Sequence, residues 1–382
     1  MVLKVNHEEM SNLINEYYNK KLALFVWGTF GIGKSHGILQ TSKKLAVERG
    51  REFIEWNKIS KEKKQEVYEY PEKYFVLIDI RLSEYDSSDI KGLPDFRSNG
   101  KDNSNEFIEW KSPFFAKLLA KDRSDGICLF DEINLSTPLV MASCYKIIYD
   151  RIINDEKVSD NWLIVGCGNL DSDRAFTHTL PSPLKDRGGE VELSIPNVED
   201  WTTNFAIPNK IDSRIIGYLN FKVSSLNKVD FEDNQKFVTP RGWERVDTLI
   251  KDVKGYKDLD LVCKSAIGEG IASEFISFCK IQEKMKLEDV IKNPKKIKDI
   301  KDISVRYFLV SVLAERYDSK KVDFGKIMEV SEVLDENKNA EFVALLWRLC
   351  SSYTEKSKRF KADFLSDTKY DKFKEKYFKF II

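Results

Sequence analysis

One segment of the chain has the residue types and the spacing of a phosphate-binding loop. It satisfies G-x-x-x-x-G-K-[ST] and comprises Gly28, Thr29, Phe30, Gly31, Ile32, Gly33, Lys34 and Ser35. In such a loop, backbone N–H groups and the positive end of the following helix bind the β- and γ-phosphates of a nucleotide. Lys34 would add a point charge, and Ser35 a ligand for Mg²⁺. The segment therefore predicts binding of ATP with Mg²⁺.

Two acids at the end of an apolar run supply the second half of such a site. Residues 127–132 read Ile-Cys-Leu-Phe-Asp-Glu. We expect Asp131 to hold Mg²⁺ through water and Glu132 to polarise the water that attacks the γ-phosphate. The alternative is that both acids only cap a helix that begins near Ser136–Pro138. The phosphate-binding loop upstream favours the first interpretation.

Two further polar residues could take part in phosphoryl chemistry. Asn169 ends the apolar run 164–169 and is a candidate for orienting the attacking water, with a turn asparagine as the alternative. Arg187 lies just before another apolar run, and a guanidinium beside a γ-phosphate can raise the rate by about 10³ to 10⁵. A solvated surface arginine is the alternative there. We expect Glu132, Asn169 and Arg187 to be catalytic.

The candidate site residues lie far apart in the sequence, so the fold must bring them to one edge of a sheet. The pattern of apolar residues predicts an α/β fold. Short apolar runs alternate with helical patterns through the first two-thirds of the chain, which is typical of a mainly parallel sheet covered by helices. We expect one five-stranded sheet, with strands at Leu22–Trp27, Tyr74–Ile80, Ile127–Phe130, Trp162–Cys167 and Val191–Ser194.

The strand signals fade after Pro196, which predicts a domain boundary. We expect an α/β nucleotide-binding domain at 1–197, a helical lid at 198–290 and a C-terminal helical extension at 291–382. Within the lid, Thr239-Pro240 predicts an N-cap followed by a first-turn proline.

The composition indicates a folded, cytoplasmic protein. The 382 residues include 62 Lys plus Arg and 62 Asp plus Glu, and this balance argues against a broadly basic nucleic-acid surface. No apolar run approaches the roughly 18 residues that a membrane span needs, and the start of the chain lacks the apolar region of a signal peptide. Six cysteines are scattered singly and three histidines lie far apart, which favours buried thiols over disulfides or a zinc site.

The order of these motifs resembles the AAA+ ATPases, and more narrowly their MoxR-like group. The resemblance covers about residues 15–290, whereas the helical tail is similar in pattern only. Beyond the phosphate-binding loop it is carried by Arg81-Leu82-Ser83, Ser88–Pro94, Asp131–Asn134, Tyr149–Ile153, Cys167–Asn169, Leu180–Arg187 and Thr239–Glu244.

The resemblance implies a P-loop sheet domain followed by a helical lid, with copies assembled into a ring, usually a hexamer, and ATP between neighbours. Asn169 then matches sensor 1, Arg187 the arginine finger that acts on the ATP of the next copy, and Arg241 sensor 2 of the lid. A lid arginine near the γ-phosphate would couple hydrolysis to domain rotation. The alternative for Arg241 is a solvated residue in the first turn of a helix.

Two parts of the resemblance leave alternatives open. The family more often has an aromatic residue directly after the arginine finger, whereas Gly188 follows Arg187 here, so the rigid support of this arginine is not given by the sequence. Lys185 is the alternative cation for the same role. Residues Ser87–Ser112 correspond to an inserted hairpin that points toward the pore of a ring. A surface that remodels a substrate and an ordinary surface loop both agree with its turn-forming residues.

Three functions agree with these observations. The first is an ATP-hydrolysing chaperone-like motor that remodels or matures a partner protein, which in the MoxR-like group is often a von Willebrand factor A domain protein. The second is a nucleic-acid-associated ATPase of a restriction or defence system, suggested by interleaved cations and aromatics in Thr354–Ile382. Because Phe373, Tyr377 and Phe380 have helical spacing, a packing stripe is the alternative for that segment. The third is a nucleotide-gated scaffold with little hydrolysis, against which the two acids argue.

Overall fold

The computed structural model describes residues 2–95, 109–154, 156–173, 178, 188–229, 236–253, 255–284, 287–353 and 357–377. The chain divides into two compact units, Met1–Ile195 and Pro196–Ile382. We call them the sheet unit and the helical unit. The domain boundary expected at residue 197 stays a prediction.

A seven-stranded parallel sheet forms the centre of the sheet unit. Its strand order is β1-β11-β2-β10-β7-β4-β3, and every neighbouring pair is parallel. The strands are β1 (Leu3–Val5), β2 (Ala23–Trp27), β3 (Glu52–Glu55), β4 (Tyr74–Arg81), β7 (Gly126–Asp131), β10 (Trp162–Gly168) and β11 (Gly188–Leu193).

The five predicted strands are confirmed as β2, β4, β7, β10 and β11, but the predicted count of five is wrong. The two additional strands, β1 and β3, lie at the two edges of the sheet. They have three and four residues, and each buries only one side chain. Short edge strands of this kind contain no continuous apolar run, so the sequence pattern does not reveal them.

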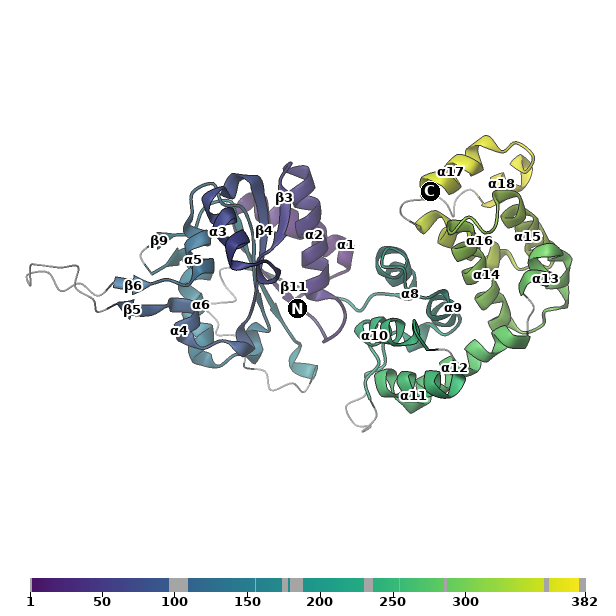
Figure 1. The fold of residues 1–382 in the computed structure, drawn as a ribbon, viewed down its shortest axis with the longest axis horizontal. Helices are drawn as coiled ribbons and strands as arrows, with labels where there is room; N and C mark the ends of the chain where they lie inside the picture. The colour runs from purple at the N-terminus through teal and green to yellow at the C-terminus, as the bar shows by residue number, and fades with distance from the viewer. Residues whose placement is uncertain are drawn as a thin grey trace, which may run out of the picture. The chain divides into compact units, whose positions relative to one another are not determined.

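Helices cover both faces of the sheet (Figure 1). One face carries α1 (His7–Lys20) and α2 (Lys34–Glu48), whose buried residues join a hydrophobic cluster with Leu24 and Leu129. The other face carries α3 (Lys61–Glu69), α4 (Ser87–Lys91), α5 (Phe114–Ala120) and α6 (Pro138–Tyr149). Short 3-10 turns are η1 (Trp56–Lys58), η2 (Pro71–Lys73), η3 (Leu82–Glu84), η4 (Ile133–Leu135) and η5 (Asp171–Asp173).

Two antiparallel ribbons extend this unit. The predicted hairpin in Ser87–Ser112 is present as β5 (Leu93–Asp95) paired with β6 (Glu109–Lys111), and the ribbon projects from the sheet unit (Figure 1). Its residues 96–108 lie outside the described residues. A second, shorter ribbon pairs β8 (Ile152–Ile153) with β9 (Glu156–Lys157).

The helical unit has one hydrophobic cluster that extends from Val198 to Tyr377. Because this cluster includes helices on both sides of residue 290, the division into a lid and an extension stays a prediction. The elements are α8 (Val198–Trp201), a π-helical turn η6 (Thr202–Ala206), α9 (Ser213–Phe221), η7 (Val223–Ser225), α10 (Pro240–Ile250), α11 (Tyr256–Ile267), α12 (Glu269–Lys284), α13 (Leu287–Lys292), η8 (Pro294–Asp299), α14 (Ile303–Asp318), α15 (Phe324–Glu336), α16 (Ala340–Ser352), α17 (Ser357–Ser366) and α18 (Asp371–Tyr377).

The helix start predicted at Thr239-Pro240 is confirmed. Pro240 is the first residue of α10, and Thr239 Oγ1 accepts a hydrogen bond of 3.3 Å from the backbone N–H of Gly242. The threonine therefore satisfies one of the backbone donors that a helix leaves unpaired at its start.

The described aromatic residues near the C-terminus pack into the core of the helical unit. Trp347 of α16 packs edge-on against Phe373 of α18 with ring centroids 5.7 Å apart. Phe378 and Phe380 lie outside the described residues. Four aromatic side chains of this segment are buried: Phe360, Phe364, Tyr370 and Tyr377. Because a buried ring offers no face to a base, the interpretation of these four side chains as a base-stacking surface is wrong.

All six cysteines are free and buried, which confirms the prediction of buried thiols. Over the residues that the structure describes, no helix combines the length and the apolarity needed to cross a membrane.

Candidate active site

The phosphate-binding loop lies between the end of β2 and the start of α2. Its last glycine, Gly33, has a φ of +100° and precedes the first residue of α2 without a side-chain cap. The positive φ favours glycine, and a Cβ at this position would also make a tight contact of 3.2 Å with Nε2 of His7. The first backbone N–H groups of α2 have no partner within the helix, which suits them to bind an anion.

The amine of Lys34 lies inside the loop. The Lys34 side chain is 8% exposed. Its Nζ donates hydrogen bonds to the carbonyl oxygens of Gly28 at 2.5 Å and Thr29 at 3.0 Å, and to Oδ1 of Asn169 at 3.1 Å. The loop lysine thus contacts both its own loop and the residue that follows β10.

Ser35 contacts the first of the two predicted acids. Ser35 Oγ donates a hydrogen bond of 2.6 Å to Oδ2 of Asp131, and Asp131 Oδ1 accepts one of 2.9 Å from the backbone N–H of Glu132. A hydroxyl and a carboxylate are hard oxygen ligands of the kind that Mg²⁺ prefers. Within the described ranges, no group of three or more His, Cys, Asp or Glu side chains forms a metal site. The Ser35–Asp131 pair fits Mg²⁺, which commonly takes its other oxygens from phosphate and water.

Glu132 is held in an unusual backbone conformation next to Asp131. Its φ is +55°, which is uncommon for a residue with a side chain and often occurs at functional sites. The carboxylate of Glu132 accepts a hydrogen bond from Oγ of Ser83, which follows β4. The following helix α6 is capped by Thr137, whose side chain accepts a hydrogen bond from Val140. The alternative that the two acids cap this helix is therefore wrong.

Asn169 is held by a residue that the sequence did not single out. Asn134 Nδ2 donates to the carbonyl oxygen of Asn169 at 2.8 Å, and the Asn169 N–H donates to Asn134 Oδ1 at 3.0 Å. These two bonds fix the backbone of Asn169, and its side chain accepts the bond from Lys34. Asn134 is buried and comes two residues after Glu132. Its position as a polar residue between the apolar Ile133 and Leu135 is the sequence signal that could have identified it.

Two more residues hold the loop and have no sequence signal of their own. His7, the first residue of α1, places Nε2 3.0 Å from the carbonyl oxygen of Ile32. On the β10 side, Thr29 Oγ1 donates to the buried carboxylate of Asp173, which also accepts a bond of 3.3 Å from the N–H of Leu170. His7 is 25 residues from Ile32, and Asp173 is 144 residues from Thr29. No local sequence pattern could therefore predict either contact.

A third carboxylate lies at the same edge of the sheet. Asp79 of β4 is opposite Leu129 of β7, two residues before Asp131. Its Oδ1 is buried and has no hydrogen-bond partner among the described residues. Burial, together with the negative charge of Asp131, raises the pKa of Asp79 to about 6, which Arg81 partly opposes. An acid that is partly protonated near neutral pH therefore lies beside the predicted Mg²⁺ ligand.

The structure brings together most, but not all, of the predicted site residues. The whole loop, both acids and Asn169 meet at the carboxyl ends of neighbouring parallel strands, where open α/β sheets bind ligands. Arg187 and its substitute Lys185 lie outside the described residues. Arg241 is the second residue of α10 in the helical unit and is exposed. Its sensor role stays a prediction.

No protein-family model matches the chain, and no curated protein matches it. Among solved structures, the chain is similar to PCH-2 of C. elegans, with 14% sequence identity and a TM-score of 0.33. The match covers 73% of this chain and 68% of PCH-2. It is similar to the RuvB Holliday junction branch migration motor of Thermotoga maritima, with 14% identity, 87% and 86% coverage and a TM-score of 0.30. It is also similar to the Aeropyrum pernix ORC2 protein in ADPNP–ADP complexes, with 11% identity, 94% coverage of both chains and a TM-score of 0.33. TM-scores at this level carry no conclusion about fold or activity, so the function is inferred from the chain's own geometry.

Proposed function

We propose that this chain is a Mg²⁺-dependent ATPase of the AAA+ class. The observation that supports it best is the connection of three neighbouring strand ends. The loop after β2 contacts Asp131 at the end of β7 through Ser35, and Asn169 after β10 through Lys34. A loop with the G-x-x-x-x-G-K-[ST] sequence, in contact with a strand-end acid, is the arrangement that P-loop nucleotide hydrolysis uses.

Each residue has a role that follows from its position. The loop N–H groups and Lys34 bind the phosphates, and Ser35 with Asp131 would hold Mg²⁺, which neutralises phosphate charge when bound. Glu132, whose carboxylate Ser83 holds, accepts a proton from the attacking water. Asn169, whose backbone is fixed, orients that water.

The finer part of the proposal is an inter-subunit mechanism. The motif order of the chain supports a MoxR-like motor whose copies form a ring, usually of six. Arg187 would reach the ATP of the neighbouring copy, and Arg241 would couple hydrolysis to movement of the helical unit. The client would be a partner protein, with a von Willebrand factor A domain protein as the first one to test.

Hydrolysis measurements on two variants test the proposal. Glu132→Gln should bind ATP and retain it, because the water is no longer activated. Arg187→Ala should bind ATP yet lose turnover at concentrations where the wild type assembles. Glu84→Gln is the matched control, because it makes the same substitution at a glutamate of η3 whose side chain is 66% exposed. Normal single-turnover hydrolysis by Glu132→Gln would contradict the ATPase mechanism, and normal turnover by Arg187→Ala would contradict only the inter-subunit part.

A further inference from the structure

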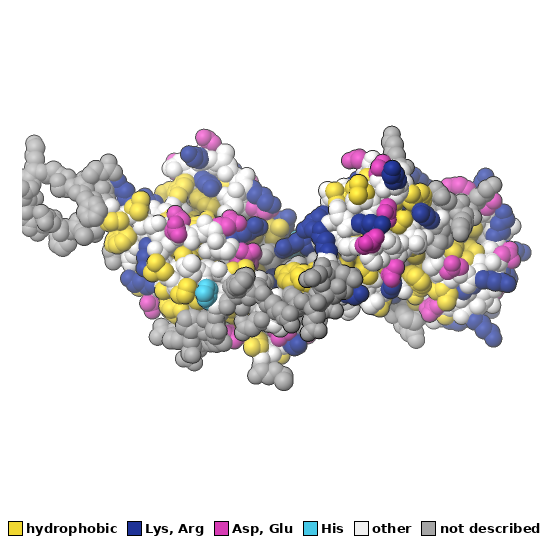
Figure 2. Space-filling view, turned by 90° about the horizontal axis from the view of Figure 1, so that it is seen from below, with side chains coloured by type: hydrophobic (Ala, Val, Ile, Leu, Met, Phe, Trp, Pro, Cys, Tyr) yellow, Lys and Arg dark blue, Asp and Glu magenta, His cyan; other side chains and the backbone are white. Residues whose placement is uncertain are grey.

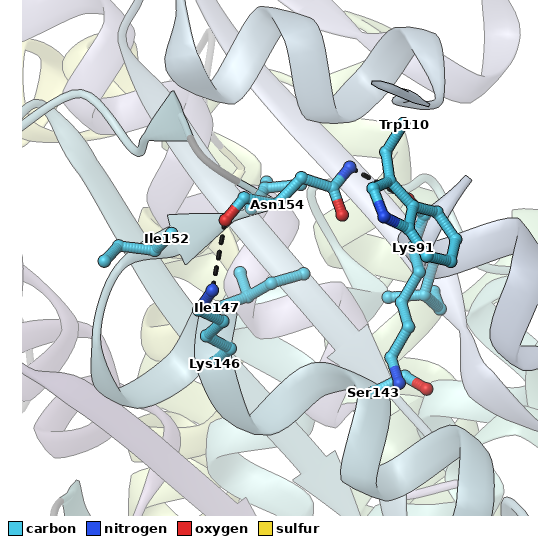
Figure 3. Close-up of a pocket in the computed structure, with 9 residues that line it drawn as sticks. Lys91, Trp110, Ser143, Lys146, Ile147, Ile152 and Asn154 are labelled. Carbon is cyan, nitrogen blue, oxygen red and sulfur yellow. Dashed lines mark hydrogen bonds between the residues drawn. The ribbon is translucent and has the colours of Figure 1, made fainter. Parts of the chain in front are cut away.

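A cavity of about 340 Å³ lies at the base of the β5–β6 ribbon and shares no residue with the candidate active site. It is lined by side chains from α4, β6, α6 and β8. Its buried floor includes Ile90, Ile147 and Ile153. Figure 3 places Asn154 between Lys146 on one side and Lys91 with Trp110 on the other. The cavity thus combines an aliphatic floor with an indole and two amines.

The exposed surface beside the cavity is apolar as well. Trp110 is 46% exposed, and Leu93 of the paired strand is 64% exposed. In the space-filling view, hydrophobic side chains gather next to the ribbon, with lysine or arginine side chains beside them (Figure 2). Large exposed apolar side chains that are contiguous with a cavity are a common mark of a binding surface. Among the described residues that line the cavity, the charged ones are Lys91 and Lys146, so the lining contains no described acid.

The wall of the cavity is held in place by Asn154. Its φ is +52°, and its Nδ2 donates to the carbonyl oxygen of Lys91 at 2.9 Å and to Oγ of Ser112 at 2.8 Å. Its own carbonyl oxygen accepts a bond of 3.1 Å from Nζ of Lys146 (Figure 3). Through its side chain and its backbone carbonyl, Asn154 therefore connects the end of α4, the residue after β6 and the last turn of α6.

The ribbon approaches the end of α4 very closely. Gly92 has a φ of +86°, and a Cβ there would lie 2.1 Å from the carbonyl oxygen of Lys111. Only glycine permits this contact. The cavity is thus preorganised by Asn154 and Gly92, and preorganisation lowers the entropic cost of binding.

We propose that this cavity is a docking site for an extended segment of a partner protein that carries an acidic side chain next to a bulky apolar one. The isoleucine floor removes the apolar side chain from water, Trp110 packs against it as an anchor, and the two lysine amines attract the carboxylate. A nucleic acid fits less well, because its phosphates need a row of cations and the floor is aliphatic. The cavity shares no residue with the candidate active site, so it can be tested separately from the proposed function.

Fluorescence anisotropy of labelled peptides with the full chain tests the proposal. The probe is a short fluorescein-labelled peptide with a Leu-Glu-Phe-Asp core, compared with the same peptide carrying Gln and Asn in place of the acids. The acidic peptide should bind at least about tenfold more tightly, and Trp110→Ala should weaken it by about tenfold or more. Tyr70→Ala, which removes another aromatic side chain of 47% exposure, is the matched control and should leave binding unchanged.

A charge reversal distinguishes specific docking from a sticky surface. The double change Lys91→Glu with Lys146→Glu should reverse the preference, so that a Leu-Lys-Phe-Lys peptide binds better than the acidic one. The single change Lys58→Glu, at a lysine that is 72% exposed elsewhere on the sheet unit, should not. Circular dichroism of each variant establishes that it is folded. Equal binding of the acidic and neutral peptides, no effect of Trp110→Ala, or displacement of the peptide by a single-stranded DNA oligonucleotide would each overturn the proposal.

Discussion

Ser35 Oγ and Asp131 Oδ2 lie 2.6 Å apart although 96 residues separate them in the chain. The sheet order explains the contact. β2 and β7 both flank β10, so the start of α2 lies over the end of β7. A hydroxyl and a carboxylate are therefore in place as oxygen ligands within a single copy of the chain.

Removing either partner of this pair should abolish Mg²⁺-dependent hydrolysis. We expect Ser35→Ala and Asp131→Asn each to lower the rate of phosphate release by about a hundredfold or more, because the ion loses an oxygen ligand. Ser304→Ala is a matched control, since Ser304 Oγ also donates a bond of 2.6 Å to an aspartate, Asp302, at the start of α14. Unchanged, metal-dependent turnover in Ser35→Ala or Asp131→Asn would remove this pair from the site.

Asn134 should affect turnover more than binding. Asn134→Ala removes both bonds to the backbone of Asn169, each worth about 1 kcal/mol, and lets the side chain that faces Lys34 move. We expect kcat to fall by about tenfold while the Kd for ATP changes less, because the phosphate contacts of the loop remain. Steady-state kinetics and nucleotide titration measure the two effects.

Asn209→Ala, at an exposed asparagine of the helical unit, serves as the control for the Asn134 variant. A loss of binding with an unchanged kcat would show that Asn134 does not act through Asn169.

Asp79 should make stability depend on pH. Its pKa of about 6 in the folded protein is above the ordinary value, so folding favours the protonated form. The stabilising contribution is complete below about pH 4 and is lost as the pH rises through about 6. Asp79→Asn cannot ionise and should be more stable than the wild type by about 1 to 2 kcal/mol near pH 8, after allowance for partial exposure, with a smaller difference near pH 5.

Urea unfolding without Mg²⁺ at the two pH values measures the Asp79 effect. Asp122→Asn is the control, because that side chain is 94% exposed and its charge should matter little at either pH. If the difference in the free energy of unfolding between Asp79→Asn and the wild type were the same at both pH values, the burial of this carboxylate would have no energetic consequence.

Two adjacent residues of α17 should differ sharply in their effect on stability. Phe364 is 5% exposed and packs edge-on against Trp347 with ring centroids 5.3 Å apart, whereas Leu365 is 76% exposed. Phe364→Ala should destabilise the helical unit by about 3 to 5 kcal/mol, because it leaves a cavity. Leu365→Ala should change the free energy of unfolding by less than about 0.5 kcal/mol. Urea unfolding followed by tryptophan fluorescence compares them, and similar midpoints would mean that the tail is not part of the core.

Several features were determined by local sequence alone. The strands β2, β4, β7 and β10 bury nearly all of their side chains, so each reads as a largely continuous apolar run, whereas β11 buries only Val191 and Leu193. The phosphate-binding loop is contiguous, and a threonine followed by proline starts both α6 and α10. In each case the residues that decide the structure are neighbours in the chain, so pattern and propensity suffice.

The tertiary structure alone decided the rest. The edge strands β1 and β3 depend on pairing with β11 and β4, because neither buries enough side chains to form a strand by itself. The contacts of His7 and Asp173 with the loop, and of Asn134 with Asn169, connect residues far apart in the chain, and a single residue type carries no record of a distant partner. The aromatic tail shows the same limit, since helical spacing agreed with both a wet binding face and a core, and only packing against Trp347 distinguished them.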